Sequence, residues 1–149
     1  MSDENNLSFL DLDGVLNNQK IIQESKKMQV IDEQNLINLN KLIKTIKKED
    51  NCSIILNSSW QLVNENIDIL KSYLNKYDLR IDDYLKIDNQ KNKGELIIEY
   101  CNKHQISFLD ILVIDDGMIS EIKDRLIKCD FNHGFTEVEL QKAIKLLKM

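Results

Sequence analysis

The feature that most constrains the fold is a short apolar run that leads directly into two carboxylates and a glycine. Residues 7–12 are mostly apolar and are predicted to form a strand buried on both faces, as at the centre of a parallel sheet. Asp11, Asp13 and Gly14 stand at the end of this run. Side chains two positions apart project from the same side of an extended backbone, so the two carboxylates are expected to lie together.

Strand-like and helix-like segments alternate along the rest of the chain. This alternation indicates a parallel sheet covered by helices on both faces. A loop or small flap is expected over residues 17–31, where no period is evident. Strands are predicted at 52–57, 84–87, 108–114 and 127–131, and helices at 32–48, 67–74, 93–101, 119–126 and 136–147. Asp32 is the expected N-cap of the first of these helices, and Thr136 with Glu139 matches a capping box.

The composition fits one domain. The 149 residues are 42% hydrophobic, with charges of both signs intermixed, so residues 1–149 are expected to form a single domain with residues 1–6 as a flexible N-terminus. The polar, acidic start lacks the regions of a signal peptide, and no apolar run reaches membrane-spanning length. We therefore expect a cytoplasmic protein that does not bind membranes.

Cysteine content and net charge narrow the chemistry. Cys52, Cys101 and Cys129 are odd in number, far apart and set in apolar segments, which favours reduced core thiols over disulfides or a zinc site. The net charge of −5 argues against non-specific binding to polyanions, for which a basic surface is expected.

Polar side chains stand at the ends of the three strongest predicted strands. In parallel sheets, ligands bind at the carboxyl ends of the strands near a topological switch point. Like charges placed this close raise each other's pKa unless a cation compensates, and a hard divalent ion such as Mg²⁺ suits oxygen ligands. We therefore predict one ligand site from these residues: Asp11, Asp13, Ser58 or Ser59, Asp115 and Asp116, with Lys93, or its neighbour Lys91, at the start of a helix.

Four motifs in a fixed order resemble those of the haloacid dehalogenase (HAD) superfamily. Residues 11–17 resemble its first motif, 54–58 its second, Lys93 its third and 113–116 its fourth. The resemblance, from about residue 7 to 148, implies a three-layer Rossmann-like (HAD-like) α/β domain. Such a domain has a central, mostly parallel sheet with helices on both faces, and no sizeable cap is expected.

More narrowly, three segments resemble the small branch of the superfamily associated with Swiss Army Knife RNA repair proteins: residues 56–60, 93–94 and 134–137. That branch often has arginine directly after the tryptophan, whereas Gln61 stands here. The substitution puts one expected contact to phosphate or substrate in doubt.

The resemblance implies a Mg²⁺-dependent phosphomonoester hydrolase that forms an aspartyl-phosphate. Asp11 would be the nucleophile and Asp13 the general acid and base. Ser58 and Lys93 would bind the phosphate. The metal ligands would be the Asp11 carboxylate, the Asp13 backbone carbonyl and Asp115, with Asp116 as second candidate or supporting partner.

The spacing of the motifs bears on the substrate. The spans from Asp13 to Ser58 and from Ser58 to Lys93 are mostly used by one helix and one strand each, which leaves no room for a cap domain. An open site admits large substrates such as nucleic acid ends or phosphoproteins and encloses a small molecule poorly. The expected substrate is a terminal phosphate of a nucleic acid or a nucleotide. The alternative hypothesis is a catalytically weak module of the same fold that binds a phosphorylated partner or another protein.

Trp60, the one tryptophan of the chain, has two interpretations. Its ring could stack on a base or sugar of a substrate. Anchoring the following turn in the core is the interpretation that its position favours.

Overall fold

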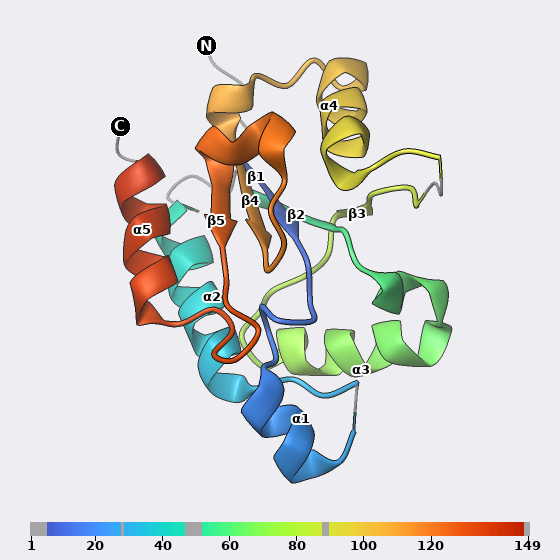
Figure 1. The fold of residues 1–149 in the computed structure, drawn as a ribbon, viewed down its shortest axis with the longest axis vertical. Helices are drawn as coiled ribbons and strands as arrows, with labels where there is room; N and C mark the ends of the chain where they lie inside the picture. Colours follow the sequence, from blue (N-terminus) through green and yellow to red (C-terminus); the bar gives the residue numbers. More distant parts are fainter. Residues whose placement is uncertain (1–5, 28, 47–51, 88–89, 148–149) are drawn as a thin grey trace.

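The computed structural model describes residues 6–27, 29–46, 52–87 and 90–147. Its centre is a five-stranded sheet of strand order β3-β2-β1-β4-β5 (Figure 1). All pairings between neighbouring strands are parallel. The strands are β1 (Asn6–Leu10), β2 (Cys52–Leu56), β3 (Asp83–Tyr84), β4 (Ile111–Asp115) and β5 (Leu126–Lys128).

The central strand β1 is apolar because both faces of the sheet are covered. Its side chains alternate between two core clusters, with Leu7 and Phe9 in one and Leu10 in the other. Leu10 lies opposite Leu56 on β2 and Ile114 on β4. This register brings the carboxyl ends of the three strands to the same level.

Helices pack on both faces of the sheet (Figure 1). The cluster that contains Leu10 also contains residues of α2 (Glu33–Ile46), α3 (Asn64–Asn75) and α5 (Glu137–Leu147). The cluster on the other face includes residues of α4 (Lys93–Lys103) and of the 3₁₀ segment η3 (Ser120–Arg125). The predicted α/β fold with a central parallel sheet is therefore confirmed.

Two predicted helix starts have the expected hydrogen bonds. At α2, the carboxylate of Asp32 accepts the backbone N–H of Gln34 at 2.9 Å. At α5, the Glu139 carboxylate accepts the backbone N–H of Thr136 at 2.8 Å, as a capping box requires. In both cases a local side chain satisfies an amide that the helix itself leaves unpaired.

The prediction of a loop over residues 17–31 was wrong for one segment. A helix, α1 (Gln19–Ser25), lies there, and the side chain of Asn18 caps it by accepting the N–H of Ile21 at 3.0 Å. None of its residues is buried. A helix that buries no side chain has no need of an apolar stripe, so periodicity could not reveal it.

Other boundaries also differ from the sequence expectation. The first part of the predicted strand 108–114 is a 3₁₀ turn, η2 (Phe108–Asp110), and the predicted helix 119–126 is η3. Phe108 and Leu109 are apolar but exposed, and the prediction wrongly assigned them to a buried strand. The two edge strands β3 and β5 are shorter than predicted because the sheet pairs them only over two and three residues.

The chain order creates a switch point beside β1. The chain passes from β1 outward to β2 and β3, then returns to the other side of β1 with β4 and β5. A crevice is expected where the carboxyl ends of β1 and β4 meet. Within the described residues, the segments between β1 and α4 contribute only β2, β3, α1, α2, α3 and the 3₁₀ turn η1 (Ser59–Leu62), so no cap domain covers this edge.

Two further expectations concern the N-terminus and membrane-spanning segments. Residues 1–5 of the expected flexible N-terminus lie outside the described residues, and Asn6 begins β1. In the part of the chain that the structure describes, none of the helices is long and apolar enough to cross a membrane.

Candidate active site

Three carboxylates meet at the switch point. Asp11 follows β1, and its backbone N–H donates to the carbonyl of Ile114 on β4 at 3.0 Å. Asp115 ends β4, and Asp116 comes next. One oxygen from each of Asp11, Asp115 and Asp116 lies within 4.8 Å of the others. The parallel pairing of β1 and β4 therefore brings together residues that are about a hundred positions apart.

Gly14 allows the third carboxylate to approach. Its φ angle is +80°, and a Cβ atom placed there would lie 2.3 Å from Oδ2 of Asp116. Any larger residue would meet both the backbone strain and this side chain. The glycine of the first motif therefore shapes the carboxylate cluster as well as the turn after β1.

Burial and mutual repulsion raise the pKa of two carboxylates of the cluster. Asp11 is 8% exposed, and burial, together with the nearby Asp115, raises its pKa to about 8. The ammonium of Lys93 opposes this rise only in part. Burial and Asp115 also raise the pKa of Asp116. A further cation would oppose both rises in pKa and favour the ionised carboxylates.

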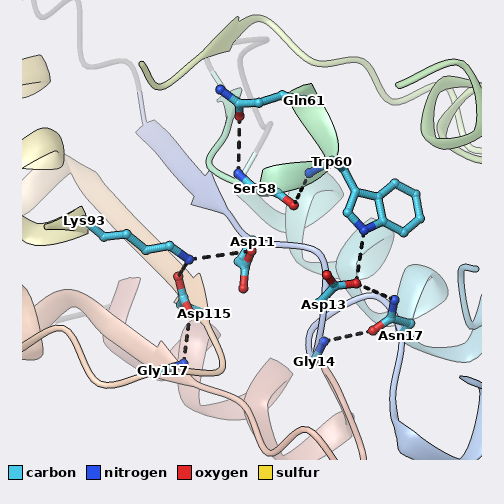
Figure 2. A network of polar contacts seen from close by, with 10 residues as sticks. All are labelled: Asp11, Asp13, Gly14, Asn17, Ser58, Trp60, Gln61, Lys93, Asp115 and Gly117. Atoms are coloured by element: carbon cyan, nitrogen blue, oxygen red, sulfur yellow. Dashed lines mark hydrogen bonds and ion pairs between the residues drawn. The ribbon is translucent and has the colours of Figure 1, made fainter. Parts of the chain in front are cut away.

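Lys93 places a positive charge beside the carboxylate cluster. It is the first residue of α4, and its ammonium lies 2.8 Å from Oδ2 of Asp115 and 3.6 Å from Oδ1 of Asp11 (Figure 2). Burial would lower the pKa of Lys93, but the neighbouring carboxylates outweigh it and raise that pKa. The rival Lys91 instead pairs with Glu99 at 2.5 Å.

The start of α4 is fixed by its own cap. Asn92 accepts the N–H of Glu95 through its side chain at 2.9 Å, and the Glu95 carboxylate accepts the N–H of Asn92. The side chain of Asn92 also donates to Glu121 at 3.0 Å. These contacts hold the helix end from which Lys93 extends to the cluster.

Ser58 lies at the carboxyl end of the neighbouring strand. It is 3% exposed and caps η1, because its Oγ accepts the N–H of Trp60 at 3.2 Å. Since this bond uses Oγ as an acceptor, the hydroxyl proton of Ser58 can still be donated. Ser59, the alternative in the sequence, is exposed.

Gln61 has a structural role where arginine was expected. Its side-chain oxygen accepts the N–H of Ser58 at 3.3 Å, and its amide donates to the carbonyl of Leu85 at 2.6 Å. An arginine could not replace the first of these bonds because it has no acceptor. Gln61 therefore connects the Ser58 turn to the segment after β3.

The carboxylate of Asp13 does not belong to the three-carboxylate cluster. Its Oδ1 accepts two hydrogen bonds of 3.0 Å, one from Nε1 of Trp60 and one from Nδ2 of Asn17 (Figure 2). Trp60 is only 2% exposed, so its ring is packed in the core and offers no open face for stacking on a base. The interpretation of Trp60 as a core anchor matches this placement.

Asn17 is a site residue that the sequence analysis missed. It is completely buried, its side-chain oxygen accepts the N–H of Gly14 at 2.9 Å, and its amide also donates to the carbonyl of Val30 at 3.0 Å. An asparagine in a predicted loop is too common to attract attention. The only signal was its position at the end of the segment that resembles the first motif.

The cluster adjoins an open hollow. A cavity of about 440 Å³ is lined by residues 92–94 at the start of α4 and by residues 115–121 after β4. Lys93, Asp115 and Asp116 line this cavity, whereas Asp11 and Ser58 do not. The donor set of this site, three carboxylates within a few ångströms, fits a hard divalent cation such as Mg²⁺.

Comparisons with known proteins agree with this geometry. A family model described as the HAD domain in Swiss Army Knife RNA repair proteins matches residues 7–140. No match was found among curated proteins or among solved structures. The matched range contains every residue of the site described above.

Proposed function

Because the chain belongs to the family of HAD domains found in Swiss Army Knife RNA repair proteins, we propose that it is a Mg²⁺-dependent phosphomonoester hydrolase. The observation that carries this proposal is the different environment of two aspartates, Asp11 and Asp13. Asp11 lies in a buried cluster beside the ammonium of Lys93, while Asp13 is held apart and its Oδ1 already accepts two hydrogen bonds. One carboxylate is thus suited to attack and the other to move protons.

In the first step, a carboxylate oxygen of Asp11 attacks the phosphorus of the substrate. The bond from phosphorus to the ester oxygen breaks, and its electron pair goes to the leaving group, which takes a proton from the protonated carboxyl of Asp13. The products are the free alcohol and an aspartyl-phosphate on Asp11. The covalent intermediate divides one difficult displacement into two easier ones.

In the second step, water attacks the phosphorus of the aspartyl-phosphate. The ionised Asp13 accepts a proton from this water, and the bond between phosphorus and the Asp11 oxygen breaks. Inorganic phosphate leaves, Asp11 returns to its carboxylate form and Asp13 is protonated again. Atoms and charges are therefore restored for the next cycle.

The remaining residues bind and neutralise the phosphoryl group. Lys93 can neutralise one oxygen while it restrains Asp11, and the hydroxyl of Ser58 can donate to another. Asp11, Asp115 and Asp116, with the backbone carbonyl of Asp13, are the proposed holders of Mg²⁺. When bound there, the ion would neutralise the carboxylates and the phosphate so that two anions can approach each other.

The substrate class follows from the open edge of the sheet. The described residues contain no cap that would enclose a small molecule, so we infer a substrate with a large group beyond the phosphate. Terminal phosphates of nucleic acids satisfy this requirement and fit the family, and the terminal phosphate of a nucleotide is the smaller alternative. The net charge of −5 means that any such contact would depend on a local positive group such as Lys93.

The test is release of inorganic phosphate from an aryl phosphate and from oligonucleotides phosphorylated at the 5′ or the 3′ end. Each assay is run with Mg²⁺ and with EDTA, on the wild type and on Asp11→Asn. We expect turnover that requires Mg²⁺ and is lost in Asp11→Asn. No turnover from folded wild-type protein on any substrate would contradict the proposal and favour the binding module.

A further inference from the structure

We propose that Trp60 and Asn17 are positioning residues that orient the carboxylate of Asp13, so that Oδ2 is the oxygen that exchanges the proton with the leaving group and with water. The inference rests on the proposed phosphatase function, because it assigns residues to the proton transfer of that reaction. Neither residue touches the phosphoryl group in this scheme. Both act through Asp13.

The geometry distinguishes the two oxygens of Asp13. Trp60 and Asn17 both donate to Oδ1, each at 3.0 Å. Among the residues that the structure describes, no donor contacts Oδ2. Hydrogen bonds to a carboxylate are stronger than those between neutral groups, so two donors on one oxygen fix the plane of the group. Oδ2 is then the oxygen left to exchange a proton.

The two donors come from different elements and hold Asp13 from two directions (Figure 2). Trp60 belongs to η1, directly after β2. Asn17 belongs to the loop after β1, the strand that positions Asp11. Because β1 and β2 are hydrogen-bonded neighbours, the two elements move together, and Asp13 cannot turn without breaking a contact to one of them.

Trp60 is poorly explained as a core residue alone. Its ring is buried in the cluster that also contains Leu10 and Leu56. An indole has a single donor, and a buried donor needs a partner. Phenylalanine would fill such a core without this requirement. The only partner that the described residues provide to Nε1 is the half-buried carboxylate of Asp13.

Asn17 uses its whole amide to set the same loop. Its oxygen accepts from Gly14, and its nitrogen donates to both Asp13 and Val30. Asn17 is thereby fixed before it contacts Asp13. A fixed donor loses little entropy when it forms the bond, so the orientation of the carboxylate is set in advance of catalysis.

One short turn links proton transfer to phosphate binding. Ser58 caps η1 by accepting the N–H of Trp60 at 3.2 Å, and it is also the proposed phosphate donor. A single rigid unit therefore sets both the distance to the phosphoryl group and the orientation of the acid. The leaving-group oxygen would lie between them.

The kinetic test uses the leaving group. An aryl phosphate with an acidic phenol needs little protonation as the ester bond breaks, whereas an alkyl phosphate needs it fully. The ratio kcat/KM reports only the steps up to release of the leaving group, whereas kcat also includes hydrolysis of the aspartyl-phosphate, which both substrates share. Trp60→Phe and Asn17→Ala should therefore lower kcat/KM about 10- to 100-fold on an alkyl phosphate, within the range of general acid catalysis. On p-nitrophenyl phosphate, kcat/KM should fall less than about threefold.

A matched control separates positioning from packing. Leu74 on α3 is 1% exposed and lies in the same core cluster as Trp60, but makes no hydrogen bond to Asp13. Leu74→Ala should reduce stability without changing the ratio of kcat/KM on the alkyl and aryl substrates. Equal losses of kcat/KM on both substrates for Trp60→Phe and Asn17→Ala would overturn the proposal.

A second measurement does not depend on activity. Because Trp60 is the one tryptophan, its indole N–H gives a single resonance in a ¹H–¹⁵N spectrum. Asp13→Asn should move the indole proton upfield, since the charged acceptor is lost, whereas Asp68→Asn on the exposed side of α3 should not. An unchanged resonance in Asp13→Asn would overturn the proposal.

The two measurements also separate this inference from the function on which it rests. If the indole resonance responds to Asp13→Asn but the wild type hydrolyses none of the phosphate esters, the phosphatase function has failed and the catalytic role of the contact falls with it. If the wild type is active and the leaving-group ratio does not change, only the positioning role is overturned.

Discussion

The ammonium of Lys93 and the carboxylate of Asp115 form an ion pair of 2.8 Å in which the Asp115 side chain is 4% exposed. The same ammonium lies 3.6 Å from Asp11, so one lysine serves two buried carboxylates. These charges are desolvated far more than those of a surface pair, and they are not fully compensated. The first three predictions follow from this imbalance.

Lys93→Met should destabilise the protein without metal by about 1–2 kcal/mol, a figure reduced for the partial exposure of Lys93, because it leaves carboxylates without their resident cation. The loss should shrink when Mg²⁺ is added. Lys91→Met is the control, since Lys91, just before α4, and Glu99 on that helix form an exposed pair worth well under about 1 kcal/mol. Chemical denaturation measures both. Equal losses would contradict the prediction.

Mg²⁺ should raise the melting temperature of the wild type more than NaCl of the same ionic strength. A ligand that binds only the folded state at 100 times its Kd adds about 2.7 kcal/mol. Asp115→Asn and Asp116→Asn, measured separately by calorimetry, should each weaken the effect, and the larger loss identifies the main ligand. A stabilisation retained by both variants would place the ion elsewhere.

Asp11→Asn should stabilise the metal-free protein at pH 8. Burial and Asp115 raise the pKa of Asp11 from 3.8 to about 8, so the folded state holds this proton more tightly than the unfolded chain. The free energy of unfolding therefore falls as the pH rises from about 4 to about 8. Asparagine does not ionise, so the variant should gain on the order of 2 kcal/mol at pH 8 and lose this advantage toward pH 4.

The control for this pH effect is Asp68→Asn, which makes the same change of charge at an exposed position of α3. Its effect on the free energy of unfolding should be small and nearly independent of pH. Denaturant titrations in EDTA at several pH values decide the matter. A wild type as stable as Asp11→Asn at pH 8 would show that Asp11 is not desolvated.

Gly134→Ala should destabilise the protein by about 1–3 kcal/mol. Gly134 has φ of +72°, and a Cβ atom there would lie 2.3 Å from Oδ1 of Asn35, whose amide donates to the carbonyls of His133 and Phe135. In Gly117→Ala the nearest atom to the new Cβ would be 3.5 Å away, so little loss is expected. Thermal unfolding of the two variants should show this difference.

Cys101 and Cys129 should resist alkylation in the folded protein. Both are buried free thiols; burial raises the pKa of Cys101 to about 11, and burial and nearby carboxylates, with Glu139 first, raise that of Cys129 well above its usual value. The thiolate is the reactive form, so little of it exists at neutral pH. In a Cys52→Ser background, a maleimide should label neither residue until denaturant is added. Rapid labelling at native conditions would contradict the burial.

Much of the fold was predictable because a buried face requires apolar residues at regular intervals in the sequence. The strand before Asp11 and the amphipathic helices α2 and α5 were found because burial on defined faces imposes a period. The helix α1 was missed because it buries nothing, and η2 was mistaken for strand because its apolar residues are exposed. Periodicity detects buried faces, and these two segments have none.

By itself, the sequence determined the order of the strands and helices, the four motifs and the residue types at the carboxyl ends of the strands. Only the tertiary structure decided which of those residues meet. The parallel pairing of β1 with β4 joined Asp11 to Asp115 and Asp116, and the turn after β2 directed Trp60 to Asp13. The physical reason is that these contacts join residues 47 or more positions apart, and a hydrogen bond or ion pair between distant residues leaves no period in the sequence.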